Sequence, residues 1–485
     1  MLVAALVTFI WLLGIVGFGF LINQKMFRFN LPRSFVLAYP TGLLVIGISA
    51  WSLWLANVPF HLIYSGFYIV VLASLFWLSK QNHFSIRTRL MWFEQLKKLV
   101  TKAEMGYLEI IMLLIIFPAI GLIVLWLLIT YPVVWDSLAL YDFRAKAIAD
   151  GWQLADFGQQ FLGHARFAGY DFSHPFGASI WQAFLHKSGW ERSGIVYIAW
   201  LISLVLYARI IWSKTGVWLI FLMMLFATKP LQVVWTQVYT SLPNTLVWLT
   251  LFLFIIDTQK QGLIKPLRPA SSIINLTYKL FLIVGIIFTR VSEPFWLIMF
   301  LWVLFFDIYY LSAYKFSKYK LLAVAFFSLA IPLIWFNQWQ SIQLEAVIIN
   351  PSTTSTTSLS SYDWSKYAGI STIFNHSEWW LQAMTVWLVK NPASSYLGLI
   401  TLLLFYSRRC VTSSLVKWLF LGLLMMGTLY FALVFEISRE IADWANKGRL
   451  LERASLPIVA WSVVMITELV AVVPELTSRH KKLEE

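Results

Sequence analysis

The segment WDSLALYDFRAKAI (residues 135–148) follows the uncharged apolar run IIMLLIIFPAIGLIVLWLLITY (residues 110–131). A run of about 20 apolar residues is long enough to cross a lipid bilayer as a helix. The segment after it therefore places two carboxylates, an arginine and a lysine just beyond the membrane boundary. Such a polar cluster is suited to chemistry on a membrane-bound substrate, but a capped surface helix has the same pattern.

The composition of the whole chain agrees with a membrane location. Of 485 residues, 60% are hydrophobic and only 12% are charged, whereas soluble domains carry about 25% charged residues. The sequence predicts an all-α polytopic membrane protein with large extracytoplasmic loops and about thirteen transmembrane helices. The expected spans are 2–22, 35–56, 60–79, 108–131, 194–212, 216–228, 242–256, 277–289, 294–312, 321–337, 381–406, 416–435 and 456–473.

Several other functions are disfavoured by composition. The net charge of +14 is not concentrated on a soluble domain, so it favours membrane orientation over nucleic-acid binding. Cys410 is the one cysteine, which excludes an internal disulfide, and no Cys/His spacing resembles a zinc site. Residues 2–22 carry no preceding basic residue and no clear cleavage site, so we interpret them as a retained span.

Alternating the spans divides the charges between two faces. Short loops on one face hold 24 of the 37 basic residues, and the other face holds 14 of the 23 acidic residues. The positive-inside rule makes the basic face cytoplasmic. This predicts a multi-pass protein of the plasma (inner) membrane, with its N-terminus outside and its C-terminus inside.

The predicted topology divides the chain into five regions. The extracytoplasmic loops 132–192, 338–380 and 436–455 carry most polar character, and function is disproportionately found in such loops. Loop 80–106 is basic and amphipathic, as expected on an anionic inner leaflet. The regions are the N-terminal spans (1–131), the first outer loop (132–192), the central spans (193–337), the second outer loop (338–380) and the C-terminal spans with a basic tail (381–485).

Residues 135–148 are predicted to form an amphipathic helix on the outer membrane surface. Leu138, Tyr141, Ala145 and Ile148 share one apolar face, and Asp142 and Lys146 lie four residues apart on another side. Gly151 ends the pattern. Asp136 falls at the start, where it could cap the helix or act as a base on an acceptor nucleophile. The sequence leaves both readings open.

Three further polar groups lie at predicted outer ends of spans. His174 precedes Pro175 at the entry to the next helix, and it could be an ordinary surface histidine. Arg290 and Glu293 stand between two apolar runs, where they could bind a ligand or simply pair with each other. Arg449 and Arg453 lie four residues apart, and arginine matches phosphate oxygens in a bidentate way.

The order of these motifs resembles the GT-C superfamily of membrane glycosyltransferases, nearest to bacterial members similar to the polyprenyl-phosphate-sugar-dependent transferases and protein O-mannosyltransferases. The resemblance rests on the Trp-Asp segment from Trp135, on the His-Pro entry to the next span, and on later short markers within residues 131–457. These markers are ATKPL (227–231), YTSLP (239–243), TRVSEP (289–294) and GRLL (448–451). Each marker is short, so their order and shared outer face carry the resemblance.

The resemblance implies a sugar transfer from a polyprenyl phosphate to a lipid, glycan or protein acceptor, with inversion at the anomeric carbon. It maps the catalytic carboxylate onto Asp136, with Asp142 as the second candidate. The phosphate-binding residues become Arg290, Arg449 and Arg453. We add Lys146 as a donor-phosphate ligand, and Tyr141, His174 and Glu293 as substrate ligands. Relatives often have an aspartate where this chain has Ser241, so the role of that carboxylate is in doubt here.

Two other classes of function stay open from the sequence. A transporter or lipid flippase would carry charges at mid-span and an inverted repeat, whereas most charges here gather near the ends. A scaffold subunit could keep the fold without activity, as the serine at 241 allows. No cofactor is required. The ligands Asp136, Asp142, Asp171 and His174 could hold a divalent cation, but their spacing is not specific for one, so no metal site is predicted.

Overall fold

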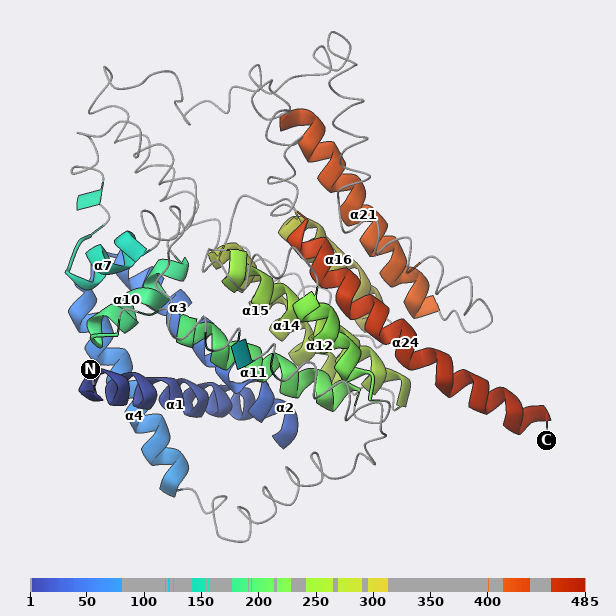
Figure 1. The fold of residues 1–485 in the computed structure, drawn as a ribbon, viewed down its shortest axis with the longest axis horizontal. Coiled ribbons are helices and arrows are strands. Elements are labelled where there is room, and N and C mark those ends of the chain that lie inside the picture. The colour runs from blue at the N-terminus through green and yellow to red at the C-terminus, as the bar shows by residue number, and fades with distance from the viewer. Residues whose placement is uncertain are drawn as a thin grey trace.

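The described part of the chain is built entirely of helices (Figure 1). The computed structural model describes residues 2–80, 118, 121–122, 125, 142–153, 156–157, 177–190, 192, 194–212, 216–227, 241–264, 269–289, 295–312, 400, 413–436 and 455–484. The principal helices are α1 (Leu2–Lys25), α2 (Leu31–Val36), α3 (Ala38–Leu55), α4 (Phe60–Lys80), α7 (Phe143–Ala149), α10 (Gly177–Lys187), α11 (Gly194–Ile211), α12 (Trp218–Ala227), α14 (Ser241–Ile264), α15 (Pro269–Thr289), α16 (Phe295–Ser312), α21 (Ser413–Glu436) and α24 (Leu456–Glu484).

Five of these helices are long and apolar enough to cross a membrane: α1, α3, α4, α11 and α14. Shorter apolar stretches lie within α15, α16, α21 and α24. The predicted all-helical class is therefore confirmed, and the five helices support the predicted membrane location. The count of thirteen spans stays a prediction, because the expected spans 108–131, 321–337 and 381–406 lie largely outside the described residues.

The helix boundaries differ from the predicted spans in three places. The expected span 35–56 is interrupted at Leu37, and the short α2 precedes the break. Asn30 starts α2 by accepting a hydrogen bond from the backbone N–H of Arg33 at 3.1 Å. The apolar run 277–289 is only the last part of α15, which begins at Pro269 and so gains the length that the run lacks. Helix α24 continues to Glu484, through the segment expected to be a tail.

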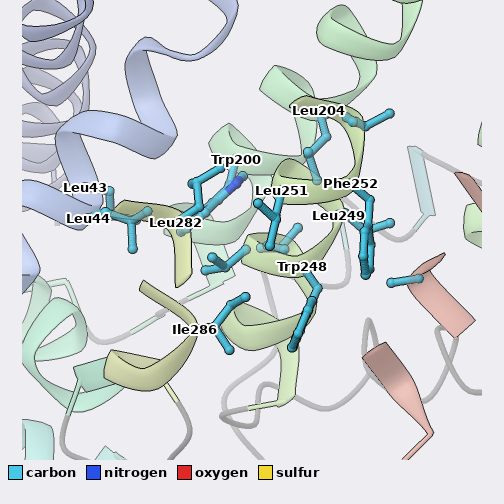
Figure 2. Close-up of a cluster of buried hydrophobic side chains, with 14 of the residues drawn as sticks. Leu43, Leu44, Trp200, Leu204, Trp248, Leu249, Leu251, Phe252, Leu282 and Ile286 are labelled. Atoms are coloured by element: carbon cyan, nitrogen blue, oxygen red, sulfur yellow. The ribbon is translucent and has the colours of Figure 1, made fainter. Parts of the chain in front are cut away.

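Helix α14 forms the centre of the bundle. Of its apolar window Leu242–Lys260, 94% is buried inside the protein. Figure 2 shows Trp248, Leu249 and Leu251 of this helix among side chains of α3, α11 and α15. In contrast, only 22% of α4 is buried, and large apolar side chains such as Ile69, Phe76 and Trp77 are exposed. A central helix packed on all sides and a peripheral helix with an apolar outer surface are typical of a membrane bundle.

Small residues allow the first helices to pack closely. A Cβ atom added at Gly19 would collide with the carbonyl oxygen of Ala38, and one added at Gly42 would collide with that of Ile15. Helices α1 and α3 therefore approach through their backbones. Because lipid tails are as apolar as leucine side chains, such close packing is a main source of helix association in a bilayer.

Candidate functional site

The described residues include two of the predicted site residues, Asp142 and Lys146. Both belong to the segment 135–148, and they lie on or next to α7. The described helix covers only residues 143–149 of the region expected to be helical, and Asp142 is its N-cap. The other predicted site residues lie outside the described part of the chain: Asp136, Tyr141, His174, Arg290, Glu293, Arg449 and Arg453.

Helix α7 has the apolar face that the sequence predicts. Ala145 and Ile148 are fully buried, whereas Lys146 is exposed. The helix ends at Ala149, and Gly151 follows with a backbone φ of +105°. Because side chains rarely adopt this left-handed conformation, glycine is suited to the stop. The predicted end of the helix is thus confirmed.

Asp142 contacts a partner that the sequence did not identify. Its Oδ1 lies 2.9 Å from Nε2 of His186, in the last turn of α10. The side chains of His186 and Asp142 are 10% and 22% exposed. The pair is therefore largely shielded from solvent, with the carboxylate the more exposed partner. The N-cap side chain makes no hydrogen bond to its own helix, so Asp142 joins two helices instead of capping one.

Helix α10 also closes the other end of α7. Lys187 Nζ donates a hydrogen bond to the carbonyl oxygen of Ala149 at 3.2 Å. A lysine at that position satisfies a backbone acceptor left free at a helix C-terminus and complements the helix dipole. His186 and Lys187 thus hold α7 at its start and at its end. Two consecutive residues of α10 define where the Asp142 carboxylate lies.

The start of α10 packs against the end of α15. Gly177 lies so close to the carbonyl oxygen of Phe288 that an added Cβ would collide with it. Asn244 of α14 donates to Thr289 Oγ1 at 3.0 Å and to the carbonyl oxygen of Ile286 at 3.2 Å. In the sequence, His174 stands three residues before Gly177, and Arg290 directly follows Thr289. The elements flanking three predicted site segments therefore meet at one end of the bundle, which we call the α7–α10 end; α7 and α10 lie together there in Figure 1.

Metal ions in proteins are held by groups of His, Cys, Asp or Glu side chains. Among the described residues, no three His, Cys, Asp or Glu side chains come together as a metal site would require. The ammonium of Lys146 forms no ion pair with a carboxylate in the same part of the chain, and Asp142, four residues earlier, pairs with His186 instead. Lys146 is therefore an exposed cation on the outer side of α7 that could contact an anionic ligand.

The opposite end of the bundle holds ion pairs of a different kind. Arg33 Nε donates to Asp257 Oδ2 at 2.8 Å, and the hydroxyl of Tyr207 donates to the same oxygen at 2.8 Å. The guanidinium also lies over the rings of Phe29 and Phe254 at 5.3 and 5.1 Å. We call this region the Arg33 end. The groups come from α2, α11 and α14, so they join three helices.

A second ion pair lies one turn further along α14. Lys260 Nζ is 2.9 Å from Glu468 Oε2, and the indole N–H of Trp212 donates to that oxygen at 2.8 Å. From the sequence alone, Arg33 and Lys260 belong to the 24 basic residues of the short loops predicted on the cytoplasmic face. The signal that could have revealed the pairs is the acidic residue beside an apolar run, because a carboxylate near hydrocarbon needs a cationic partner.

Comparisons with protein-family models, with curated proteins and with solved structures found no match to this chain.

Proposed function

We propose that this protein is a membrane glycosyltransferase of the GT-C type, which moves a sugar from a polyprenyl phosphate to an acceptor hydroxyl on the extracytoplasmic face. The observation that supports it best is the meeting of three elements at the α7–α10 end. Helix α7 carries Asp142, α10 follows His174 in the chain, and α15 precedes Arg290. A site of this type needs carboxylates and phosphate-binding cations at one membrane boundary.

In the proposed reaction, Asp136 deprotonates or orients the acceptor hydroxyl, with Asp142 as the second carboxylate. The acceptor oxygen attacks the anomeric carbon while the bond to the lipid phosphate breaks. Arg290, Arg449 and Arg453 stabilise the negative charge on the departing phosphate, and Lys146 supplies a further cation. Preorganised charges of this kind are usually the largest contribution to catalysis of such a step. Tyr141, His174 and Glu293 bind the sugar or the acceptor.

The orientation in the membrane is part of the proposal. We infer that the α7–α10 end is extracytoplasmic and that the Arg33 end is cytoplasmic. The support is the distribution of charge: Lys25, Arg33, Arg209 and Lys260 all belong to the loops that the positive-inside rule assigns to the cytoplasm. The thirteen spans and the two large outer loops, 132–192 and 338–380, belong to the same proposal.

The direct test is the transfer of label from a panel of polyprenyl-phosphate sugars by the purified protein. Asp136→Asn and Asp142→Asn should each lower transfer by about 10²- to 10⁴-fold, the usual contribution of acid–base catalysis. The matched control is Asp150→Asn, because Asp150 is exposed at the other end of α7. Full activity in Asp136→Asn would remove this residue from the base role. A wild-type protein inactive with every donor would contradict the transferase function and favour a scaffold.

Topology has an independent test. Replacing Cys410 by serine removes the one native cysteine, and a new cysteine at Asp363 then reports on the second large loop. We expect an impermeant thiol reagent to label it from the extracytoplasmic side. Labelling from the cytoplasm alone would overturn the orientation and the proposed reaction together.

The transporter alternative draws on one observation of the structure. Asp257 and Glu468 are buried in helices with apolar windows, as a transporter or flippase would require. However, Asp257 lies near the last residue of the window Leu242–Lys260, not at its middle. Its oxygen is also occupied by Arg33 and Tyr207. A carboxylate already bound in this way is better suited to holding helices together than to carrying a substrate.

A further inference from the structure

Among the described residues, the Asp142–His186 pair uses one polar atom of each partner. Nε2 of His186 and Oδ1 of Asp142 are 2.9 Å apart. Within the described residues, His186 Nδ1 and Asp142 Oδ2 make no hydrogen bond. An ionised carboxylate only accepts hydrogen bonds, so the neutral imidazole carries its proton on Nε2. The second carboxylate oxygen is then available to a ligand hydroxyl, and Nδ1 is available to protons from solvent.

The helix that carries His186 is held rigidly. The ring of Phe184 stacks on Trp11 with centroids 4.8 Å apart and contacts Phe60 edge-on at 5.2 Å. Just after the end of α10, the hydroxyl of Ser188 lies 3.1 Å from the hydroxyl of Tyr64 in α4. The last turn of α10 is thus tied to α1 and α4 on one side and to α7 on the other. Such support limits the movement of the His186 ring and, through it, of the Asp142 carboxylate.

The electrostatic surroundings of His186 are simple. Helices α1, α3 and α15 contribute no charged side chain near this end of the bundle, since α3 has none and Lys25 and Lys279 lie elsewhere along α1 and α15. In the described part of the chain, Asp142 is the one charged partner within hydrogen-bond distance of the ring. The titratable and charged groups on the other elements around it are Arg144 and Lys146 of α7, its caps Asp142 and Asp150, Lys187 of α10, and His61, Tyr64, Tyr68 and the last residue, Lys80, of α4.

We propose that His186 is a positioning residue for Asp142, and that of the two carboxylates in the proposed site Asp142 receives the proton of the acceptor hydroxyl while Asp136 orients that hydroxyl. The inference rests on the proposed transferase function. His186 donates from Nε2 to Oδ1 and so leaves Oδ2 facing the acceptor. The O–H bond of the acceptor breaks, its proton moves to Oδ2, and the oxygen lone pair forms the new bond to the anomeric carbon. The bond from that carbon to the phosphate breaks, and its electron pair leaves with the phosphate.

The pair should make transfer dependent on pH. When the imidazole is protonated, its positive charge beside Asp142 stabilises the ionised carboxylate and weakens it as a proton acceptor. Transfer should therefore be slow at low pH and rise as the imidazole loses its proton. A histidine that only joined two helices would not impose this dependence on the reaction.

The test measures the rate of sugar transfer against pH in the wild type, His186→Gln and His186→Phe. A glutamine amide can still donate to Asp142 but does not titrate, so His186→Gln should keep transfer within a few-fold at pH 8 and lose the histidine step. His186→Phe removes the donor, and misplacement of a reacting group costs about 10²-fold. His186→Gln with the wild-type pH profile, or His186→Phe with the wild-type rate, would overturn the inference and leave the transferase function intact.

The two proposals fail in different ways. If the wild type transfers label and the His186 variants behave as wild type, only the inference is lost. If the wild type transfers label from no donor in the panel, the proposed function fails and the inference fails with it. Should His186→Phe not fold, the comparison of the wild type with His186→Gln decides the question alone.

Discussion

The two ends of the bundle use ion pairs in different ways. At the Arg33 end, Asp257 accepts hydrogen bonds from Arg33 and Tyr207, and the arginine is covered by two aromatic rings. At the α7–α10 end, Asp142 and His186 are more exposed and share a single hydrogen bond. A buried and saturated pair can hold helices together but has little left to offer a ligand. A pair that is partly exposed and that uses one polar atom of each partner among the described residues contributes less to stability and can take part in chemistry.

The largest effect should come from breaking the buried pair. Asp257→Ala leaves the Arg33 guanidinium buried without this carboxylate, which should lower the free energy of unfolding by about 3–5 kcal/mol. Denaturant unfolding of the detergent-solubilised protein would measure it. The control is the double variant Arg33→Met with Asp257→Leu, which removes both charges and should be clearly more stable than the single variant. Equal stability of the two would mean that the buried charge is not what matters.

A smaller effect is expected where α10 meets α15. Gly177→Ala places a Cβ against the carbonyl oxygen of Phe288, and overpacking of this kind costs about 1–3 kcal/mol. Transfer should fall too, because α10 shifts relative to α15. Gly66→Ala is the matched control, since an added Cβ there meets no atom within 4 Å. If both variants unfold at the same denaturant concentration, the contact at Gly177 does not position α10.

The second ion pair of the Arg33 end should be weaker than the first. Lys260 is 30% exposed, so solvent screens its interaction with Glu468. Glu468→Gln keeps an oxygen that can accept from Trp212, and we expect the free energy of unfolding to fall by about 0.5–1.5 kcal/mol. The same unfolding experiment at low and high salt would check it. A loss as large as that of Asp257→Ala would show that exposure does not separate these two pairs.

The smallest change in stability is expected at the α7–α10 end. His186→Phe removes a partly exposed pair and should lower the free energy of unfolding by about 0.2–1 kcal/mol, although its effect on transfer should be large. Tyr64→Phe is the control, because it removes a neighbouring hydrogen bond to Ser188 without touching Asp142. If His186→Phe lowers the free energy of unfolding as much as Asp257→Ala does, the Asp142–His186 pair also serves to hold helices together. The two ends of the bundle would then not differ in how they use their ion pairs.

The candidate site was only partly predictable. Asp142 stood out in the sequence because it follows a predicted membrane span among other polar residues, and the structure shows it in a polar contact with His186. His186 did not stand out, since a histidine in the last turn of a helix is common and favourable with the helix dipole. Asp142 and Lys146 have the spacing of an ion pair within one helix, but Asp142 forms its hydrogen bond with His186 of another helix. The spacing of residues within one helix cannot show which side chain a neighbouring helix places beside them.

The sequence by itself determined the class of this protein and the positions of its main helices. Apolar runs of membrane length, and a glycine that ends α7, act through local hydrophobicity and backbone conformation, so they can be read residue by residue. The structure adds the interruption at Leu37, between α2 and α3. It also decides which charged side chains pair with each other. Arg33 meets Asp257 across 224 residues, and Asp142 meets His186 across 44. Such pairs form because helix packing brings distant segments together, and no pattern within either segment specifies that meeting.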